Sequence, residues 1–177
     1  MASVDIVIPV YNEEHVLAES VTTLRRFLSG SLPHQWRILI ADNASTDGTL
    51  AVAQRLAHKH PDVASLHIPR KGRGRALKAA WLSSAADIVS YMDVDLSTDL
   101  EAFPPLIEAI ASEGYDIAIG SRLSPASDIR RSLRREVLSR GYNLMVKALF
   151  FTRFSDAQCG FKALSRQAVQ KLVPLVE

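Results

Sequence analysis

The sequence predicts an α/β domain with a mostly parallel, Rossmann-like sheet flanked by helices. Short apolar runs alternate along the chain with amphipathic segments of ten or more residues, which is typical of βαβ units. The 177 residues are 47% hydrophobic and 23% charged, a composition that suits one soluble globular domain with a real core. No internal repeat, linker or low-complexity segment interrupts the pattern, so we expect a single domain over residues 1–177.

Five apolar runs predict the strands. They are rich in Val, Ile and Leu, and turn-forming residues follow most of them. The first is expected to end at Pro9, which has no backbone N–H to give to a sheet. In chain order, the expected strands cover residues 4–8, 37–41, 63–68, 87–92 and 115–119.

Five amphipathic segments predict the helices. The first is expected to begin at an Asn12 cap, with Glu13 and Glu14 in its first turn and an apolar face that extends to Leu28. The later helices are expected from the polar turn at 42–48 to about residue 58, and then over 76–84, 99–112 and about 131–151.

Composition and charge restrict the function classes. A single cysteine excludes an internal disulfide, and we find neither a signal peptide nor an apolar stretch near the ~20 residues of a membrane span. The net charge of +2 is unevenly distributed: residues 1–121 carry 10 Lys/Arg and 15 Asp/Glu, and residues 122–177 carry 11 and 4. The basic C-terminal part suits an anionic partner, although uneven surface charge is the alternative.

An aspartate pair, Asp93 and Asp95, follows the fourth apolar run. In an extended chain, side chains at i and i+2 point the same way, so the two carboxylates can converge beyond the end of a buried strand. Ligands bind at that edge of an open α/β sheet. Two close carboxylates repel each other unless a proton or a cation lies between them, and the pair therefore suggests a hard divalent metal.

Three polar loops are expected at the same edge of the sheet, at 9–13, 42–47 and 93–95. A carboxylate after the second strand is well placed to bind a ribose or a base. A basic loop at 70–75 places cations around two glycines, which suits a diphosphate, although a solvated basic turn is the alternative. Together these loops predict a nucleotide and metal site.

The segment after residue 120 is rich in arginine. On a helix, Arg131, Arg135 and Ser139 would share one face, and guanidinium groups suit phosphate. Nucleic acid is not expected, because no aromatic residues are interleaved and the overall charge is only slightly positive. The apolar residues of this helix could lie against a membrane surface, or they could pack into the core beneath an exposed arginine face.

Taken in order, five segments resemble the motifs of the family 2 glycosyltransferases of the GT-A fold. They are IPVYNEE at 8–14, DNASTDGT at 42–49, KGRGRA at 71–76, DVDL at 93–96 and GSR at 120–122. Two later segments, SRGYN at 139–143 and DAQCGFK at 156–162, look most like the dolichyl-phosphate glucosyl- and mannosyltransferases. Members of that branch usually continue past the position of Glu177, so we expect a GT-A catalytic domain over residues 1–177 that is either a short natural form or truncated at its C-terminus.

The resemblance implies a role for each matching residue. The nucleoside pocket would be lined by Pro9, Tyr11, Glu13 and Asp42, with Arg73 nearby. Asp93 and Asp95 would hold Mg²⁺ or Mn²⁺ against the donor diphosphate, and with Arg122 they form the expected catalytic set. The lipid phosphate would be received by Arg122, Arg135 and Ser139.

The implied reaction is an inverting transfer of glucose or mannose from a UDP- or GDP-sugar to a polyprenyl (dolichyl-type) phosphate. Metal and arginine can neutralise the departing diphosphate. A phosphate acceptor with a second pKa of ~6 is already largely ionised at neutral pH and needs no general base. We expect a peripheral protein at the cytoplasmic face of a membrane, with a membrane-anchoring subunit as a potential partner.

Two other functions stay open from the sequence. An aspartate pair after an apolar strand also occurs in haloacid-dehalogenase-like phosphatases, where Asp93 would be the nucleophile and Asp95 the acid/base. That motif normally follows the first strand of its fold, whereas here it follows the fourth. The second alternative is a domain that binds a sugar nucleotide, or a partner subunit, without any turnover of its own.

Overall fold

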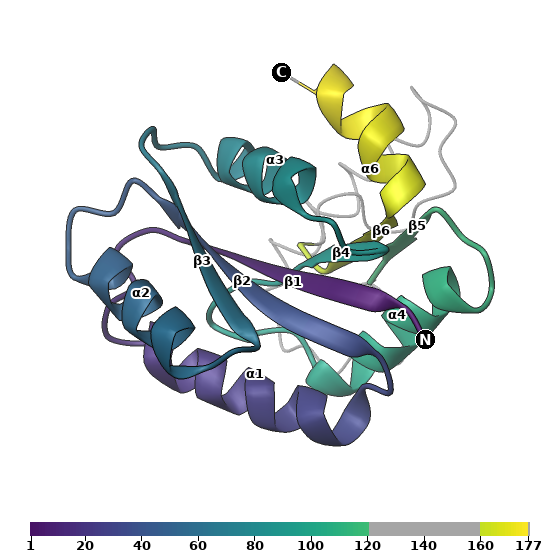
Figure 1. Ribbon diagram of the computed structural model, residues 1–177, viewed down its shortest axis with the longest axis horizontal. Helices are drawn as coiled ribbons and strands as arrows, with labels where there is room; N and C mark the ends of the chain where they lie inside the picture. Colours follow the sequence, from purple (N-terminus) through teal and green to yellow (C-terminus); the bar gives the residue numbers. More distant parts are fainter. Residues whose placement is uncertain (121–159, 177) are drawn as a thin grey trace, which may run out of the picture.

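The computed structural model describes residues 1–120 and 160–176. Within them, a central sheet has the strand order β3-β2-β1-β4-β6-β5 (Figure 1). Strands β1 to β4 are parallel, and β6 runs antiparallel to both β4 and β5. The strands are β1 (Ser3–Val10), β2 (Gln35–Asn43), β3 (Val63–Ile68), β4 (Ile88–Tyr91), β5 (Ile117–Ile119) and β6 (Lys162–Ser165). The expected mostly parallel sheet is confirmed.

Helices cover both faces of this sheet. Helices α1, α2 and α4 lie on one face, and α3 and α6 lie on the other (Figure 1). Their bounds are α1 (Leu17–Ser31), α2 (Thr49–Lys59), α3 (Arg73–Ser83), α4 (Phe103–Ala111) and α6 (Arg166–Leu172), with 3₁₀ turns η1 (Leu100–Ala102) and η2 (Val173–Leu175). The expected helix at 131–151 lies outside the described residues, as do Arg122, Arg135 and Ser139.

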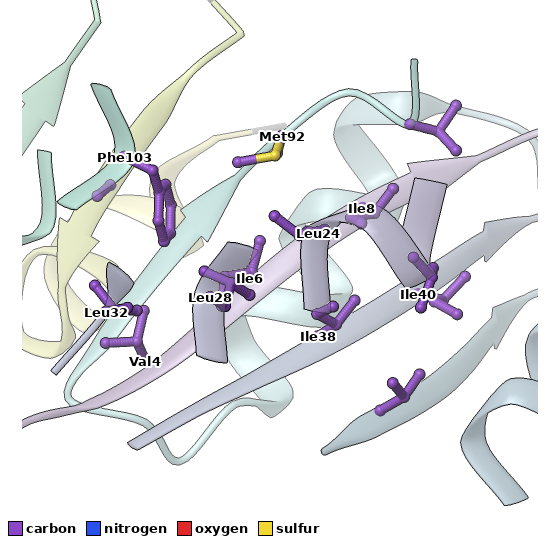
Figure 2. Packing of buried hydrophobic residues seen from close by; sticks show 14 of the residues in the cluster. Val4, Ile6, Ile8, Leu24, Leu28, Leu32, Ile38, Ile40, Met92 and Phe103 are labelled. Carbon is purple, nitrogen blue, oxygen red and sulfur yellow. The ribbon is translucent and has the colours of Figure 1, made fainter. Parts of the chain in front are cut away.

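The larger core lies between the sheet and the layer formed by helices α1, α2 and α4. Leu24 and Leu28 of α1 are fully buried, and they belong to one apolar cluster with the inward-facing isoleucines of β1 and β2, Ile6, Ile8, Ile38 and Ile40 (Figure 2). Full burial of each such side chain contributes about 1.5–3 kcal/mol. The apolar spacing predicted for the first helix is confirmed, and this packing fixes the strand ends where the site lies.

Strand β1 continues through Pro9 to Val10, so the expected stop at Pro9 is wrong. The backbone carbonyl of Val7 accepts a hydrogen bond from the Met92 N–H, and odd-numbered residues of β1 therefore direct their backbone groups toward β4. Pairing between β1 and β4 ends at the Val7–Tyr91 pair. Pro9 faces a position beyond that pairing, where the sheet requires no N–H.

Two helix starts also differ from expectation. Helix α1 begins at Leu17, and its N-cap, Val16, makes no side-chain cap, so Asn12 does not cap it. Helix α3 begins at Arg73 instead of residue 76, which places part of the basic loop in its first turn. The prolines of the fourth expected helix, Pro104 and Pro105, lie in the first turn of α4, where a missing N–H has no helical partner to lose.

Strand β6 and helix α6 were not predicted. The strand has only four residues, and it lies in the sheet between β4 and β5, from which it is far away in the sequence. Ser165 then caps α6, because its hydroxyl oxygen accepts a hydrogen bond from the Ala168 N–H at 3.1 Å. Because β6 pairs with β4, Gly160 and Phe161, which precede β6, lie close to the end of β4.

Candidate functional site

The loops after β1 and β2 are interlocked. The backbone of Asn12 lies in the left-handed region (φ 57°), and its Oδ1 accepts a hydrogen bond from the Thr46 N–H at 2.8 Å. Its own N–H donates to Ser45 Oγ at 3.0 Å, and the N–H of Glu13 donates to Thr49 Oγ1 at 2.7 Å. Asn12 therefore connects the two loops, and these hydrogen bonds hold the ends of β1 and β2 in fixed positions relative to each other.

The acidic residues of these loops are partly engaged in the same connection. The Gly48 N–H donates to Glu14 Oε2 at 2.7 Å, and the Thr49 N–H donates to Asp47 Oδ1 at 3.0 Å. Burial by itself would raise the pKa of Asp47, but the hydrogen bonds from Thr49 more than offset it, so that pKa lies below its ordinary value. Glu14 and Asp47 therefore have structural roles.

Asp42 lies at the end of β2 and is completely buried. Its Oδ2 is 2.7 Å from Nδ1 of His67, its cross-strand partner on β3. Its Oδ1 is buried and is the one such side-chain atom without a hydrogen-bond partner among the described residues. An unmade hydrogen bond at a buried carboxylate costs free energy, so this oxygen is suited to accept a hydrogen bond from a ligand.

The basic loop, residues 70–75, contacts the ends of three strands, β1, β2 and β4. Three consecutive residues each reach a different one: Lys71 Nζ lies over the Tyr11 ring (3.8 Å to the centroid), the Gly72 N–H donates to Asn43 Oδ1 (2.7 Å), and the Arg73 guanidinium contacts the Asp93 carboxylate. The sequence placed the loop near the site, and the structure makes it the element that joins the site together. Cations therefore lie directly against the acidic edge of the sheet.

Helix α3 begins within this loop. Gly72 is its N-cap and has φ 152°, a backbone conformation that other residues rarely adopt. A β carbon on Gly74, in the first turn, would have no heavy atom within 4 Å. The N-terminus of a helix presents free N–H groups and the positive end of its dipole, which suits a phosphate group.

The aspartate pair lies in a tight turn. The Leu96 N–H donates to the backbone carbonyl of Asp93 at 3.2 Å, and Leu96 has φ 48°. The expected extended geometry of residues 93–95 is therefore wrong, because β4 ends at Tyr91 and the chain turns back immediately. Asp93 Oδ1 accepts a hydrogen bond from Tyr91 Oη at 2.7 Å, and Asp95 Oδ1 accepts one from the Ser97 N–H at 3.0 Å.

The donor set of the pair fits a hard divalent cation. Asp95 is exposed and the Asp93 side chain is 34% exposed, so both carboxylates are accessible to an ion and to its water ligands. The described residues contain no group of three or more His, Cys, Asp or Glu that could hold a metal. One or two carboxylates, completed by substrate phosphates and water, are the usual protein contribution to a Mg²⁺ site.

The structure brings Pro9, Tyr11, Glu13, Asp42, Arg73, Asp93 and Asp95 to one edge of the sheet. Sequence reasoning gave no role to His67, Tyr91 or Gly160. His67 is the cross-strand neighbour of Asp42. Tyr91 is the last residue of β4, two positions before Asp93, and its hydroxyl donates to that carboxylate. Gly160 lies in the DAQCGFK motif at 156–162, but its closeness to Asp93 and Tyr91 becomes visible only in the folded chain.

No helix among the described residues is long and apolar enough to cross a lipid bilayer.

A family model supports the resemblance over nearly the whole chain. Residues 5–173 match the model described as "Glycosyl transferase family 2". Among solved structures, glucosyl-3-phosphoglycerate synthase from Mycobacterium tuberculosis has a TM-score of 0.67, is 23% identical in sequence, and aligns with 94% of this chain and 57% of its own. The same enzyme with Mn²⁺, UDP and phosphoglyceric acid has a TM-score of 0.65. This likeness confirms the GT-A fold.

Curated relatives include enzymes of lipid-linked sugar transfer. The chain is 36% identical over 176 residues to glycosyltransferase AglD of Haloferax volcanii, covering 98% of this chain and 28% of that protein. A dolichyl-phosphate beta-glucosyltransferase of Trichomonas vaginalis is 31% identical (95% and 53% covered), and the dolichol-phosphate mannosyltransferase of Pyrococcus furiosus is 32% identical (94% and 47%). The chain thus spans about half the length of these relatives or less.

These matches exclude the haloacid-dehalogenase-like phosphatase as an alternative. The motif order, the strand order and the family model agree with one another. The chain belongs to glycosyl transferase family 2, a family of glycosyltransferases.

Proposed function

We propose that this domain transfers a hexose from a UDP-sugar to a polyprenyl phosphate. The observation that supports it most is the bridging loop, in which Lys71, Gly72 and Arg73 reach the ends of β1, β2 and β4. A loop of cations that leads into the N-terminus of a helix, placed against a carboxylate pair, suits a diphosphate together with a divalent cation.

Asp42 favours uracil over guanine in the donor. Its Oδ2 is engaged by His67, which leaves Oδ1 as the single unpartnered acceptor. Uracil offers one N–H donor on its pairing edge, whereas guanine offers a ring N–H and an amino group side by side and binds best to both oxygens of a carboxylate. The solved structures of the M. tuberculosis enzyme with UDP are consistent with this choice.

Residues of the chain would bind and orient the donor. Tyr11 and Asp42 would hold the nucleoside, and Arg73 with the first turn of α3 would receive the diphosphate. Asp93 and Asp95 would hold Mg²⁺ or Mn²⁺, which when bound supplies Lewis-acid neutralisation of the leaving diphosphate. A phosphate oxygen of the acceptor would form a bond to the anomeric carbon from the opposite side, as the bond from that carbon to the nucleoside diphosphate breaks. The configuration at that carbon inverts.

The acceptor assignment comes from the relatives. Two of them are named for transfer to dolichyl or dolichol phosphate. In this chain, Arg122, Arg135 and Ser139 would bind the acceptor phosphate, and Arg122 would also help to stabilise the transition state. Since the acceptor is a membrane lipid, we propose that the protein acts at a membrane surface, on its cytoplasmic face.

A transfer assay tests the proposal. The chain is incubated with UDP- or GDP-linked glucose or mannose, a short polyprenyl phosphate and Mn²⁺, and the lipid product is measured. We expect product from a UDP-sugar, and none from the Asp95→Ala variant. Binding of UDP-sugar without any product would support the alternative of a domain that only binds the donor. Full activity of the Asp95→Ala variant would contradict the metal assignment.

A further inference from the structure

We propose that Tyr91 and Gly160 are positioning residues that together fix the Asp93 carboxylate for metal and diphosphate binding. The inference rests on the proposed function, and it concerns two side-chain positions that do not themselves ligate the ion. Tyr91 is the last residue of β4, and Gly160 comes shortly before β6. The two therefore approach Asp93 from segments nearly 70 residues apart in the sequence.

Tyr91 holds the carboxylate from one side. Its hydroxyl donates to Asp93 Oδ1 at 2.7 Å, while its ring is buried, with the whole residue only 6% exposed. The Arg73 guanidinium lies 5.3 Å from the centroid of the same ring and also contacts Asp93 Oδ1. The phenol therefore connects the carboxylate, the bridging loop and the core. Because the ring is held by packing, its hydroxyl gives the carboxylate a fixed orientation.

Gly160 provides the space on the other side. A β carbon at this position would lie 3.0 Å from Asp93 Oδ2, 3.0 Å from Tyr91 Cε1 and 3.1 Å from Tyr91 Oη. The glycines with positive φ in the described part of the chain are Gly72 and Gly114, so Gly160 is not needed for an unusual backbone conformation. Its missing side chain is what allows the carboxylate and the phenol to lie where they do.

Tyr91 and Gly160 act on different oxygens of the Asp93 carboxylate. Oδ1 is oriented by Tyr91 and Arg73, and Oδ2 lies 3.0 Å from the place that a β carbon at position 160 would occupy. A carboxylate that is hydrogen-bonded in this way loses less rotamer freedom when it binds an ion. We therefore expect both positions to act mainly on the affinity for the cation and to leave the chemical step unchanged once the cation is saturating.

The test compares Tyr91→Phe and Gly160→Ala with two matched controls. Tyr115→Phe removes a hydroxyl from a residue that is 59% exposed, and Gly30→Ala adds a methyl group where no heavy atom lies within 4 Å. The affinity for Mn²⁺ in the presence of saturating UDP is measured by electron paramagnetic resonance, and transfer is measured against Mn²⁺ concentration. Loss of one contact to a metal-ligating carboxylate is expected to weaken Mn²⁺ binding roughly tenfold.

The expected result is weaker Mn²⁺ binding in both test variants, with kcat recovered at high Mn²⁺, and no change in the controls. Unchanged Mn²⁺ affinity in Tyr91→Phe, with the parent chain binding normally, overturns this inference and leaves the proposed function intact. Absence of Mn²⁺ binding by the parent chain overturns both. If Tyr91→Phe does not fold, Gly160→Ala decides, because it disturbs the same carboxylate from the opposite side.

Discussion

Replacing Asp42 by asparagine should separate binding from stability. The parent carboxylate is fully buried, with His67 at 2.7 Å on one oxygen and no partner on the other. Asparagine keeps the shape but removes a buried charge, which favours the folded state, and weakens the contact with His67, which disfavours it. Since these terms oppose each other, the free energy of unfolding should change by less than about 1 kcal/mol.

Nucleotide affinity should change much more. The variant loses a charged acceptor for the base N–H, an interaction of about 1.5–3 kcal/mol, and this predicts UDP binding that is about 10- to 150-fold weaker. Titration calorimetry with UDP and urea unfolding measure the two quantities on the same preparation. Asp62→Asn is the matched control, because its carboxylate pairs with Arg25 away from the site. Parent-like UDP affinity in a folded Asp42→Asn variant would refute the role given to Asp42.

Three further predictions concern stability and the bridging loop. Asp5→Ala removes the buried partner of Arg37 (2.6 Å) and should cost about 2–3 kcal/mol in urea unfolding, and an unchanged midpoint would contradict this. Gly72→Ala forces a side chain to φ 152° and should cost about 1–3 kcal/mol and weaken UDP binding; equal UDP affinity would argue against the loop's role. Hydrogen bonds from the backbone and hydroxyl of Ser3 lower the pKa of Asp87 below its ordinary 3.8. The stability that this gives is present above 3.8 and is lost as the pH falls from that value through the lower pKa of the folded state, so in urea unfolding Asp87→Asn should lose less stability than the parent as the pH falls below about 4.

Local patterns were sufficient for much of the fold. The apolar spacing of α1 and the alternation of strands and helices depend on neighbouring residues, and both predictions are confirmed. Strand β6 could not be found in this way, because four residues carry no clear period and its partners lie far away in the sequence. The role of Asn12 was missed for a related reason. An asparagine amide can cap a helix or bind the backbone of another loop, and which of the two it does here depends on the neighbouring loop, whose Thr46 N–H donates to Asn12 Oδ1.

The site was predicted in its composition more than in its geometry. Parallel strands place their carboxyl ends together, so the gathering of the three loops follows from the topology. The turn at Asp93 could not be anticipated, because β4 ends at Tyr91, one residue before the expected end of the strand, and the aspartate pair leaves the extended conformation. Gly160 was quoted as part of a motif, but the reason for a glycine there depends on the distance to Asp93 and Tyr91, which exists only in the folded chain.

The affinity of the chain for UDP, measured with Mn²⁺ and again after chelation of divalent ions, shows whether the donor site depends on a metal. If the bridging loop and the aspartate pair form one diphosphate and metal site, chelation should weaken UDP binding at least about tenfold, and Asp95→Ala should bind equally weakly in both conditions. UDP binding of equal strength with Mn²⁺ and with a chelator would show that the loop and the aspartate pair do not form one such site.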